Sequence, residues 1–222
     1  RNFNYRNNLI VSANLINECI TYGTKVIFTS SMAVYGDQTP PFTEDKRPQP
    51  IDPYGIAKYA VECDLKLAHE QFGLRYNIVR PHNVLGIYQN IWDRYRNVIG
   101  IFIRKALNGQ PILIYGDGEQ TRAFSDIKYY MEPFDKLLTG HDSETFNIGA
   151  DKHFTLNEVA MTVQTIAAKY GYHVDIEHGE PRHEAKHAYC DHTKAKTVLN
   201  FEDNTNLAEL IESMFVWAMK QP

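Results

Sequence analysis

A tyrosine and a lysine stand four residues apart in the segment Tyr54-Gly55-Ile56-Ala57-Lys58. Because residues at this spacing share one face of a helix, the phenol and the ammonium can lie together. A free phenol, with a pKa of about 10, is a poor base at neutral pH, and a neighbouring cation lowers that pKa. The pair could therefore remove a proton from a sugar or alcohol hydroxyl. The same spacing also arises by chance on helix surfaces, where it has no chemical role.

A hydroxyl-rich segment upstream supplies a second polar group. Residues 25–29 are predicted to form a short buried strand that runs into Thr29-Ser30-Ser31-Met32-Ala33-Val34-Tyr35-Gly36. Side chains at the carboxyl end of a parallel strand lie where α/β sheets bind ligands. Ser31 could therefore hydrogen-bond the oxygen that Tyr54 deprotonates. The alternative is that these hydroxyls only end the strand in a turn.

The elements that must position these side chains alternate along the chain. Apolar residues at helical spacing predict helices over residues 7–22 and 54–72, each ended by a glycine. Residues 25–29 and 76–80 have the composition of strands. The order strand, helix, strand predicts an α/β fold with a parallel sheet.

The rest of the chain is predicted to contain shorter elements after a polar and aromatic loop over residues 82–97. Thr155 and Glu158 form a capping-box pattern at the start of one predicted helix. The expected helices cover residues 98–108, 129–139, 156–170, 193–199 and 207–219, and the expected strands cover 111–115 and 146–148.

The composition is that of a globular protein. The chain has 222 residues, a net charge of −4, 43% hydrophobic residues and three cysteines. It contains no run of 18 apolar residues, so we expect no membrane span, and its mild acidity gives no reason to expect a nucleic-acid partner. An odd number of dispersed cysteines without a Cys-x-x-Cys pair favours a reducing compartment, and we expect a cytoplasmic protein.

Four ordered motifs resemble one enzyme family. They are Ser-Ser-x-x-Val-Tyr-Gly after a strand, Pro-Tyr-Gly-x-x-Lys, Arg-Pro-x-Asn-Val-x-Gly and Tyr-Gly-Asp-Gly-x-Gln-Thr-Arg. This order resembles the extended short-chain dehydrogenase/reductases, and within them the NAD-dependent nucleotide-sugar epimerases and dehydratases of the UDP-glucose 4-epimerase type. The resemblance covers nearly the whole chain.

The resemblance implies the C-terminal part of a Rossmann-type parallel sheet with a smaller mixed α/β substrate-binding lobe. Residues 1–81 would form the second half of the NAD-binding domain. Residues 82–222 would form mostly the nucleotide-sugar lobe, with about 98–150 partly returning to the sheet. No glycine-rich phosphate loop follows any predicted strand. We therefore expect the family's first βαβαβ unit to precede this segment and the chain alone to be incomplete for NAD binding.

The resemblance also implies residue roles near the cofactor. Ser31 would be the catalytic hydroxyl, Tyr54 the base, and Lys58 the group that lowers the Tyr54 pKa and binds the nicotinamide ribose. Asn7 falls at a family position near the cofactor. His82 falls where the backbone lies beside the nicotinamide.

A second set of residues matches substrate contacts. Asn83 and Asn97 correspond to contacts with the nucleotide-sugar phosphates, and Tyr189 to a residue lining the sugar pocket. Arg122 and Arg182 correspond to two arginines that clamp the diphosphate. Forked guanidinium groups suit phosphate oxygens, whereas without the resemblance these two would be ordinary surface cations.

The two positions that directly follow Ser31 distinguish dehydration from epimerisation in this family. The family's dehydratases carry Asp-Glu there, and this chain has Met32 and Ala33. Neither side chain transfers protons, so the sequence favours C4 epimerisation of a UDP-hexose through a 4-keto intermediate. The alternatives are a nucleotide-sugar reductase or decarboxylase, or a truncated non-catalytic nucleotide-sugar-binding protein.

Two further expectations complete the prediction. His178, His183 and His187 have no nearby cysteine or carboxylate in a zinc-binding pattern, so we expect no metal. The resemblance implies a homodimer that pairs through the helices near 9–22 and 55–72.

Overall fold

The fold was analysed in a computed structural model that describes residues 2–92, 97–181 and 187–221. The chain divides into two compact units. Unit 1 comprises residues 2–82, 129–149 and 189–202, and unit 2 comprises the described residues of 83–128, 150–188 and 203–221. The first division between the units falls between His82 and Asn83, and residues 189–202 group with unit 1. The domain assignment made from the sequence stays a prediction.

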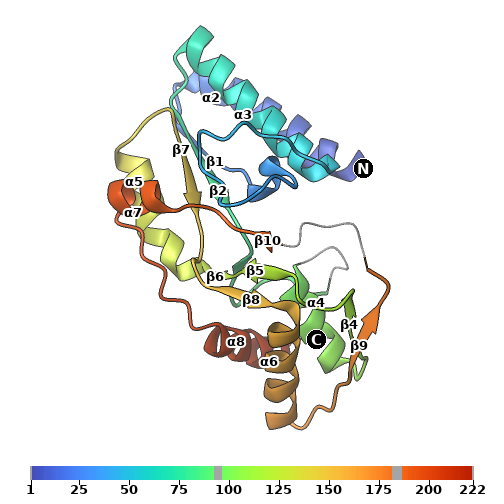
Figure 1. The fold of residues 1–222 in the computed structure, drawn as a ribbon. Coiled ribbons are helices and arrows are strands. Elements are labelled where there is room, and N and C mark those ends of the chain that lie inside the picture. The colour runs from blue at the N-terminus through green and yellow to red at the C-terminus, as the bar shows by residue number, and fades with distance from the viewer. Residues whose placement is uncertain (1, 93–96, 182–186, 222) are drawn as a thin grey trace. The chain divides into compact units, whose positions relative to one another are not determined.

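Unit 1 is built on a three-stranded parallel sheet (Figure 1). Its central strand is β2 (Tyr76–Pro81), flanked by β1 (Val26–Thr29) and β7 (Glu144–Ile148). Because all three strands run the same way, the segments that follow them meet at one edge of the sheet. Residues Ser30, His82 and Gly149 stand directly after β1, β2 and β7 at this carboxyl edge.

Two long helices cover one face of the sheet. α2 (Val11–Tyr22) and α3 (Pro53–Phe72) pack against each other, and each ends at a glycine in the left-handed conformation, as predicted. A short α1 (Asn2–Asn4) and a π-helical stretch (Tyr5–Ile10) precede α2. The core residues beneath α2 and α3 are Ile16, Cys19, Val61, Leu65, Ala68, Leu74, Tyr76 and Ile78.

The other face of β2 meets the segment that contains α5 (Met131–Thr139). Side chains alternate along a strand, so Asn77 points away from the Tyr76 and Ile78 face. Its buried amide donates to the carbonyl oxygens of Leu137 and His141. The helix α7 (Thr193–Leu199) lies beside β7, where Lys194 donates to the Thr145 carbonyl.

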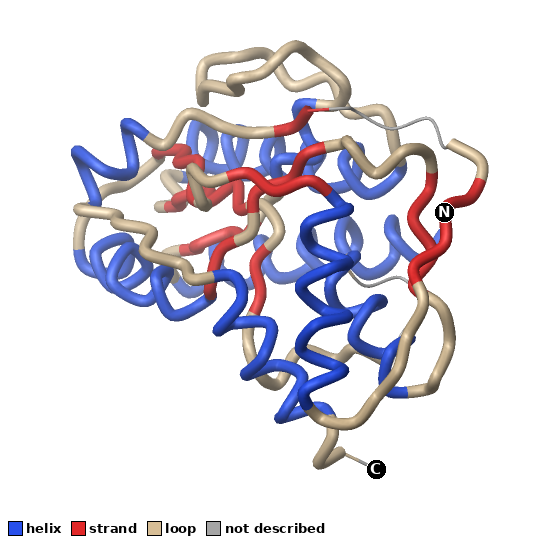
Figure 2. Tube along the Cα trace, turned by 60° about the horizontal axis from the view of Figure 1, so that its bottom comes forward, coloured by secondary structure: helices blue, strands red, loops and turns tan. Residues whose placement is uncertain are grey.

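Unit 2 combines short strands with three helices around one apolar core. α4 (Val98–Leu107), α6 (Leu156–Lys169) and α8 (Leu207–Ala218) supply most of its buried side chains. Figure 2 shows these helices and strands along the trace. The strands are β3 (Val84–Leu85) with β6 (Ser125–Asp126), β4 (Ile112–Tyr115) with β9 (Ile176–Gly179), and β5 (Thr121–Ala123) between β8 (His153–Thr155) and β10 (His187–Ala188).

The predicted helices and longer strands are confirmed, including the capping box of Thr155 and Glu158. One expectation was wrong: β1 was predicted to be buried, but Val26, Ile27 and Phe28 are half-buried and Thr29 is exposed. The reason is that, among the described residues, β1 has β2 as its single neighbouring strand, so its other side is not covered by the sheet. Within the described residues, no helix combines the length and apolar content needed to cross a membrane.

Candidate functional site

The start of α3 presents Tyr54 at the carboxyl edge of the unit 1 sheet. Asp52 caps this helix, because its carboxylate accepts hydrogen bonds of 2.8 Å from the backbone N–H groups of Tyr54 and Gly55. Pro53 occupies the first turn, where its missing N–H costs nothing. These local signals begin the helix directly before Tyr54. Lys58 consequently lies one turn further along it.

A tight turn carries Ser31 toward this helix. Ser31 caps the 3₁₀ turn over Met32–Tyr35, and its Oγ accepts a hydrogen bond of 3.2 Å from the Ala33 N–H. A Cβ at Gly55 would lie only 2.5 Å from the Ala33 carbonyl oxygen. Any side chain at position 55 would therefore push α3 away from the turn. The glycine in Tyr54-Gly55 permits the close approach of Ser31 and Tyr54.

The three predicted catalytic side chains come together in unit 1. Burial raises the pKa of Tyr54 above its usual value, and the nearby Ser31 hydroxyl offsets only part of this rise. The ammonium of Lys58 donates to the Thr29 carbonyl at 2.7 Å and stands 5.8 Å from the centre of the Tyr54 ring. Burial lowers the pKa of Lys58. The arrangement places a phenol, a hydroxyl and a cation around one point where a substrate hydroxyl could exchange a proton.

Two other predicted cofactor residues lie in unit 1 with different surroundings. The side chain of Asn7 is exposed, and it donates 2.8 Å to the Phe3 carbonyl of its own helix. His82 is 2% exposed and follows β2 directly, so it belongs to the same sheet edge as Ser31. The cofactor roles of both residues stay predictions.

Three predicted substrate residues gather in unit 2. Asn83 donates 2.9 Å to the carbonyl of Ala123, the residue after Arg122. Asn97 donates 3.4 Å to the carbonyl of Val84, the residue after Asn83, and its oxygen caps α4 through the Gly100 N–H. The pairing of β3 with β6 holds these segments together. The backbone segments that carry Asn83, Asn97 and Arg122 are therefore neighbours, and the anion-binding role of the three side chains stays a prediction.

The remaining two predicted substrate residues, Tyr189 and Arg182, are not among the unit 2 residues described above. Tyr189 groups with unit 1, where its carbonyl accepts 3.0 Å from the Phe42 N–H. Arg182 lies outside the described residues, as does His183. Neither role is tested by the described contacts.

The histidines singled out in the sequence do not cluster within the described residues: His178 contacts Asn157, and His187 contacts Thr121. A different histidine pair, which the sequence did not suggest, is present in unit 1. His82, Cys190 and His192 are all buried, with potential ligand atoms within 4.8 Å of one another. The Nε2 atoms of the two histidines are 2.9 Å apart, and their nearly parallel rings have centroids 5.0 Å apart.

This geometry describes an imidazole–imidazole hydrogen bond. The ring centroids are only about 2 Å further apart than the nitrogens, so His82 and His192 meet end to end. One Nε2 donates and the other accepts, and both nitrogens point along the same line. Metal ligands would instead direct two lone pairs at a third point. Burial also raises the pKa of the Cys190 thiol beside this pair.

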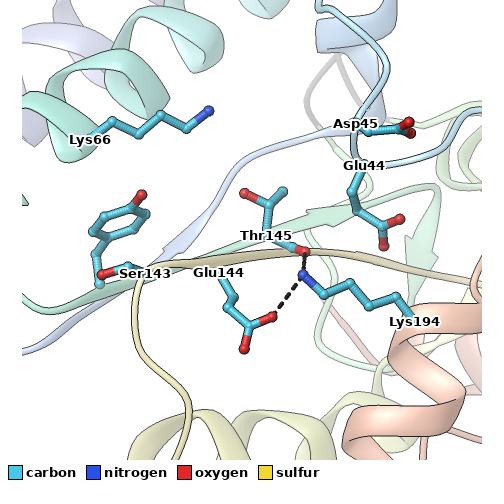
Figure 3. A pocket seen from close by; sticks show the side chains of 8 residues that line it. Glu44, Asp45, Lys66, Ser143, Glu144, Thr145 and Lys194 are labelled. Carbon is cyan, nitrogen blue, oxygen red and sulfur yellow. Dashed lines mark hydrogen bonds and ion pairs between the residues drawn. The ribbon is translucent and has the colours of Figure 1, made fainter.

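A polar pocket of about 560 Å³ lies at the opposite end of the unit 1 strands (Figure 3). It is lined by the first residues of β2 and β7, Tyr76 and Glu144, and by Lys194, which is ion-paired with Glu144 at 2.8 Å. Lys66 reaches it from α3, twelve residues or about 18 Å along the helix from Tyr54. Ligands of parallel sheets bind at the carboxyl edge, so this pocket is not the catalytic site.

Sequence reasoning missed a buried charged pair behind the catalytic side chains. Glu62 and Arg80 are 0% and 1% exposed, and two hydrogen bonds of 2.9 and 2.6 Å join them. One signal was available: Glu62 continues the four-residue spacing of Tyr54 and Lys58 along α3.

Comparison with known proteins identifies related enzymes. The profile of the NAD dependent epimerase/dehydratase family matches residues 2–149. A UDP-N-acetyl-alpha-D-glucosaminuronate decarboxylase from Bacillus cytotoxicus is 32% identical over 218 residues, covering 92% of this chain and 66% of the relative. The chain spans between 60 and 66% of the length of five curated relatives that it matches.

Solved structures agree with the sequence matches. A UDP-glucose 4-epimerase from Thermotoga maritima with UDP-glucose has a TM-score of 0.87 and 32% identity, covering 96% of this chain and 69% of the other. A UDP-N-acetylglucosamine 4-epimerase from Methanobrevibacter ruminantium, in complex with UDP-N-acetylmuramic acid, has a TM-score of 0.88 and 29% identity. That match covers 98% of this chain and 70% of the other.

Proposed function

Since the chain belongs to the NAD dependent epimerase/dehydratase family, we propose that its protein is an NAD-dependent 4-epimerase of a UDP-hexose. One observation carries the proposal: Ser31 lies beside Tyr54 at the carboxyl end of a parallel sheet, where the start of α3 approaches the turn that Ser31 caps, with Lys58 one helical turn away. The two epimerases with TM-scores of 0.87 and 0.88 support the same reaction class.

The mechanism follows from the chemistry of the three side chains. The phenolate of Tyr54 takes the proton of the substrate's C4 hydroxyl as that carbon is oxidised to a ketone, and returns it when the ketone is reduced. Ser31 stabilises the phenolate by hydrogen bonding and can donate to the same substrate oxygen. Met32 and Ala33 offer no acid or base beside it, so the site does not provide for loss of water from the sugar.

The residues present suit the nicotinamide end of NAD. The Lys58 ammonium has three donors, one of which is directed to the Thr29 carbonyl, and a ribose hydroxyl can accept from another. The same cation favours the phenolate form of Tyr54. Bound NAD supplies the chemistry of hydride acceptance from C4 and hydride return to the opposite face of the ketone.

The diphosphate is assigned to unit 2 under this proposal. Arg122, Asn83 and Asn97 come from neighbouring backbone segments there, and guanidinium and amide groups suit phosphate oxygens. Arg182 and Tyr189 are proposed as the further diphosphate and sugar contacts. Asn7 and the backbone of His82 are proposed as additional cofactor contacts.

The deciding experiment compares the parent protein with Tyr54→Phe. Each is supplied with NAD and UDP-glucose or UDP-galactose, and interconversion of the two sugars is followed. Removing the phenol oxygen removes the base, so we expect activity to fall by about 10²–10⁴-fold. Full activity in Tyr54→Phe would overturn the mechanism.

A decarboxylase is the second candidate, because the Bacillus cytotoxicus relative with that name is 32% identical. Supplying a UDP-hexuronic acid and measuring carbon dioxide release distinguishes the two reactions. Retained NAD after purification favours the epimerase, whereas exchange of NADPH favours a reductase. Binding of UDP without turnover of any sugar would favour a non-catalytic nucleotide-sugar-binding protein.

We also propose a cytoplasmic homodimer. Apolar side chains on α2 and α3 are exposed, among them Val11, Leu15, Ile56 and Leu67, and pairing of two chains would cover them. The three free cysteines support a reducing compartment. Light scattering tests the pairing, and a monomeric mass would contradict it.

A further inference from the structure

A buried ion pair joins the helix that carries Tyr54 to the central strand of unit 1. Glu62 on α3 accepts from Arg80 on β2 through Nε at 2.9 Å and through Nη2 at 2.6 Å. Their side chains are 0% and 2% exposed. Burial alone would lower the pKa of Arg80, but the hydrogen-bonded carboxylate of Glu62 raises it, so the guanidinium is charged. An ion pair this deeply buried is often no more stabilising than apolar residues of similar volume.

The Glu62 carboxylate accepts a third hydrogen bond, from the residue next to the catalytic hydroxyl. Ser30 Oγ donates 2.5 Å to the same Oε1 that accepts from Arg80 Nε. Ser30 is fixed further by its backbone N–H, which donates 2.7 Å to the Val79 carbonyl. The residue immediately before Ser31 is therefore held by both α3 and β2.

The guanidinium of Arg80 fixes the segment after Ser31. Its Nη1 donates 2.7 Å to the hydroxyl of Tyr35, which ends the 3₁₀ turn that Ser31 caps. That hydroxyl in turn donates 2.8 Å to Asn147 Oδ1 on β7. Ser31 thus lies between Ser30 and Tyr35, and each of these two residues is hydrogen-bonded to a member of the Glu62–Arg80 ion pair.

The helix is fixed by the same contact. Tyr54, Lys58 and Glu62 occupy successive turns on one side of α3. Locking Glu62 to β2 sets the rotation of α3 about its axis, and with it the direction of the Tyr54 phenol. We propose that Glu62 and Arg80 are positioning residues that hold Ser31 beside Tyr54. This inference rests on the proposed epimerase function for the roles of Ser31 and Tyr54.

The first test removes single links from the network. Ser30→Ala deletes only the hydroxyl that joins the catalytic turn to Glu62, and Glu62→Gln places an amide N–H against Arg80. Small displacements of reacting groups lower turnover strongly, so we expect kcat to fall about 10–100-fold while KM for the UDP-sugar changes less than about threefold. Glu132→Gln is the matched control, because Glu132 pairs with Lys136 at 2.9 Å on the exposed surface. Parent kcat in both Ser30→Ala and Glu62→Gln would overturn the proposal.

A double variant separates positioning from stability. Glu62→Leu with Arg80→Met replaces the ion pair by apolar side chains, a change that often leaves stability intact. We expect this variant to unfold near the parent's urea midpoint and still to lack normal kcat, because the hydroxyls of Ser30 and Tyr35 lose their hydrogen bonds to Glu62 and Arg80. Parent kcat in a stably folded double variant would show that the pair serves only the fold and would overturn the proposal. If the double variant does not fold, Ser30→Ala decides alone.

A titration of Tyr54 tests the geometry without turnover. The Tyr54 signal in carbon-13 tyrosine-labelled protein is assigned by comparison with Tyr54→Phe, and its pKa is measured by NMR. Since the nearby Ser31 hydroxyl lowers the Tyr54 pKa, displacing it in Ser30→Ala and Glu62→Gln is expected to raise that pKa, whereas Glu132→Gln is not. A shift in a protein that turns over no sugar would refute the epimerase function and keep the positioning role. An unchanged Tyr54 pKa in both variants would overturn the positioning role.

Discussion

Gly149 and His82 lie so close together that a Cβ at position 149 would stand 2.0 Å from His82 Nε2. The two residues directly follow β7 and β2, which are neighbouring strands of the parallel sheet. His82 keeps its place through the 2.9 Å hydrogen bond to His192. The absence of a side chain at Gly149 is therefore what admits the imidazole pair at the carboxyl edge of unit 1.

Gly149→Ala is expected to destabilise the protein by about 1–3 kcal/mol, because the new methyl group overpacks a buried ring. Urea unfolding measures the change. In a His82→Ala background the same substitution should cost less, since the obstructing ring is gone. Gly140→Ala is the control, because its Cβ would meet only the Lys136 carbonyl oxygen at 3.4 Å. Equal costs with and without the His82 ring would contradict this reading.

The capping box of α6 provides a second stability test. Thr155 Oγ1 accepts from the Glu158 N–H at 3.1 Å, and the Glu158 carboxylate accepts from the Thr155 N–H at 2.7 Å. Thr155→Ala removes the first of these bonds and is expected to lower the free energy of unfolding by about 1 kcal/mol. Thr165→Ala on the exposed side of the same helix should change it little. A larger loss at position 165 than at 155 would refute the capping argument.

Local signals predicted most of the fold. The glycines at 23 and 73 end α2 and α3 in left-handed conformations, and the Thr155–Glu158 pattern begins α6. Strands of two or three residues, such as β6 and β8, were missed because so few residues show no alternation of apolar and polar side chains. The partial exposure of β1 was missed because a strand's place in the sheet depends on its partners and not on its own composition.

The sequence predicted the residues of the candidate site that belong to short contiguous motifs, and it did not predict those that come together only in the fold. Tyr54, Lys58 and Ser31 come from contiguous patterns, and the structure brings them together. The Glu62–Arg80 pair was not predicted, because charged residues on a helix and a strand are usually solvated and nothing in the sequence joins two positions 18 residues apart. The pairing is a consequence of how α3 packs on β2.

Ser31→Ala is expected to move the pH dependence of turnover. The rate rises with pH as Tyr54 loses its proton; burial raises the pKa of this phenol and the Ser31 hydroxyl lowers it. Removing the hydroxyl therefore raises the Tyr54 pKa and shifts the rising limb to higher pH. The measurement is kcat as a function of pH. Ser213→Ala, an exposed serine on α8, should leave the profile unchanged, and a rising limb that moves to lower pH in Ser31→Ala would contradict the assignment.

Lys58→Met is expected to weaken both the action of Tyr54 as a base and the binding of NAD. The substitution keeps the length of the side chain but removes the cation that stands 5.8 Å from the Tyr54 ring and donates to the Thr29 carbonyl. The phenolate loses a favourable charge, so kcat near neutral pH is expected to fall about 10²-fold and the rising limb to move to higher pH. The affinity for NAD should fall as well, because one donor to the ribose is lost. Lys66→Met, an exposed lysine two turns further along α3, is the control, and equal kcat and NAD affinity in the two variants would refute the role given to Lys58.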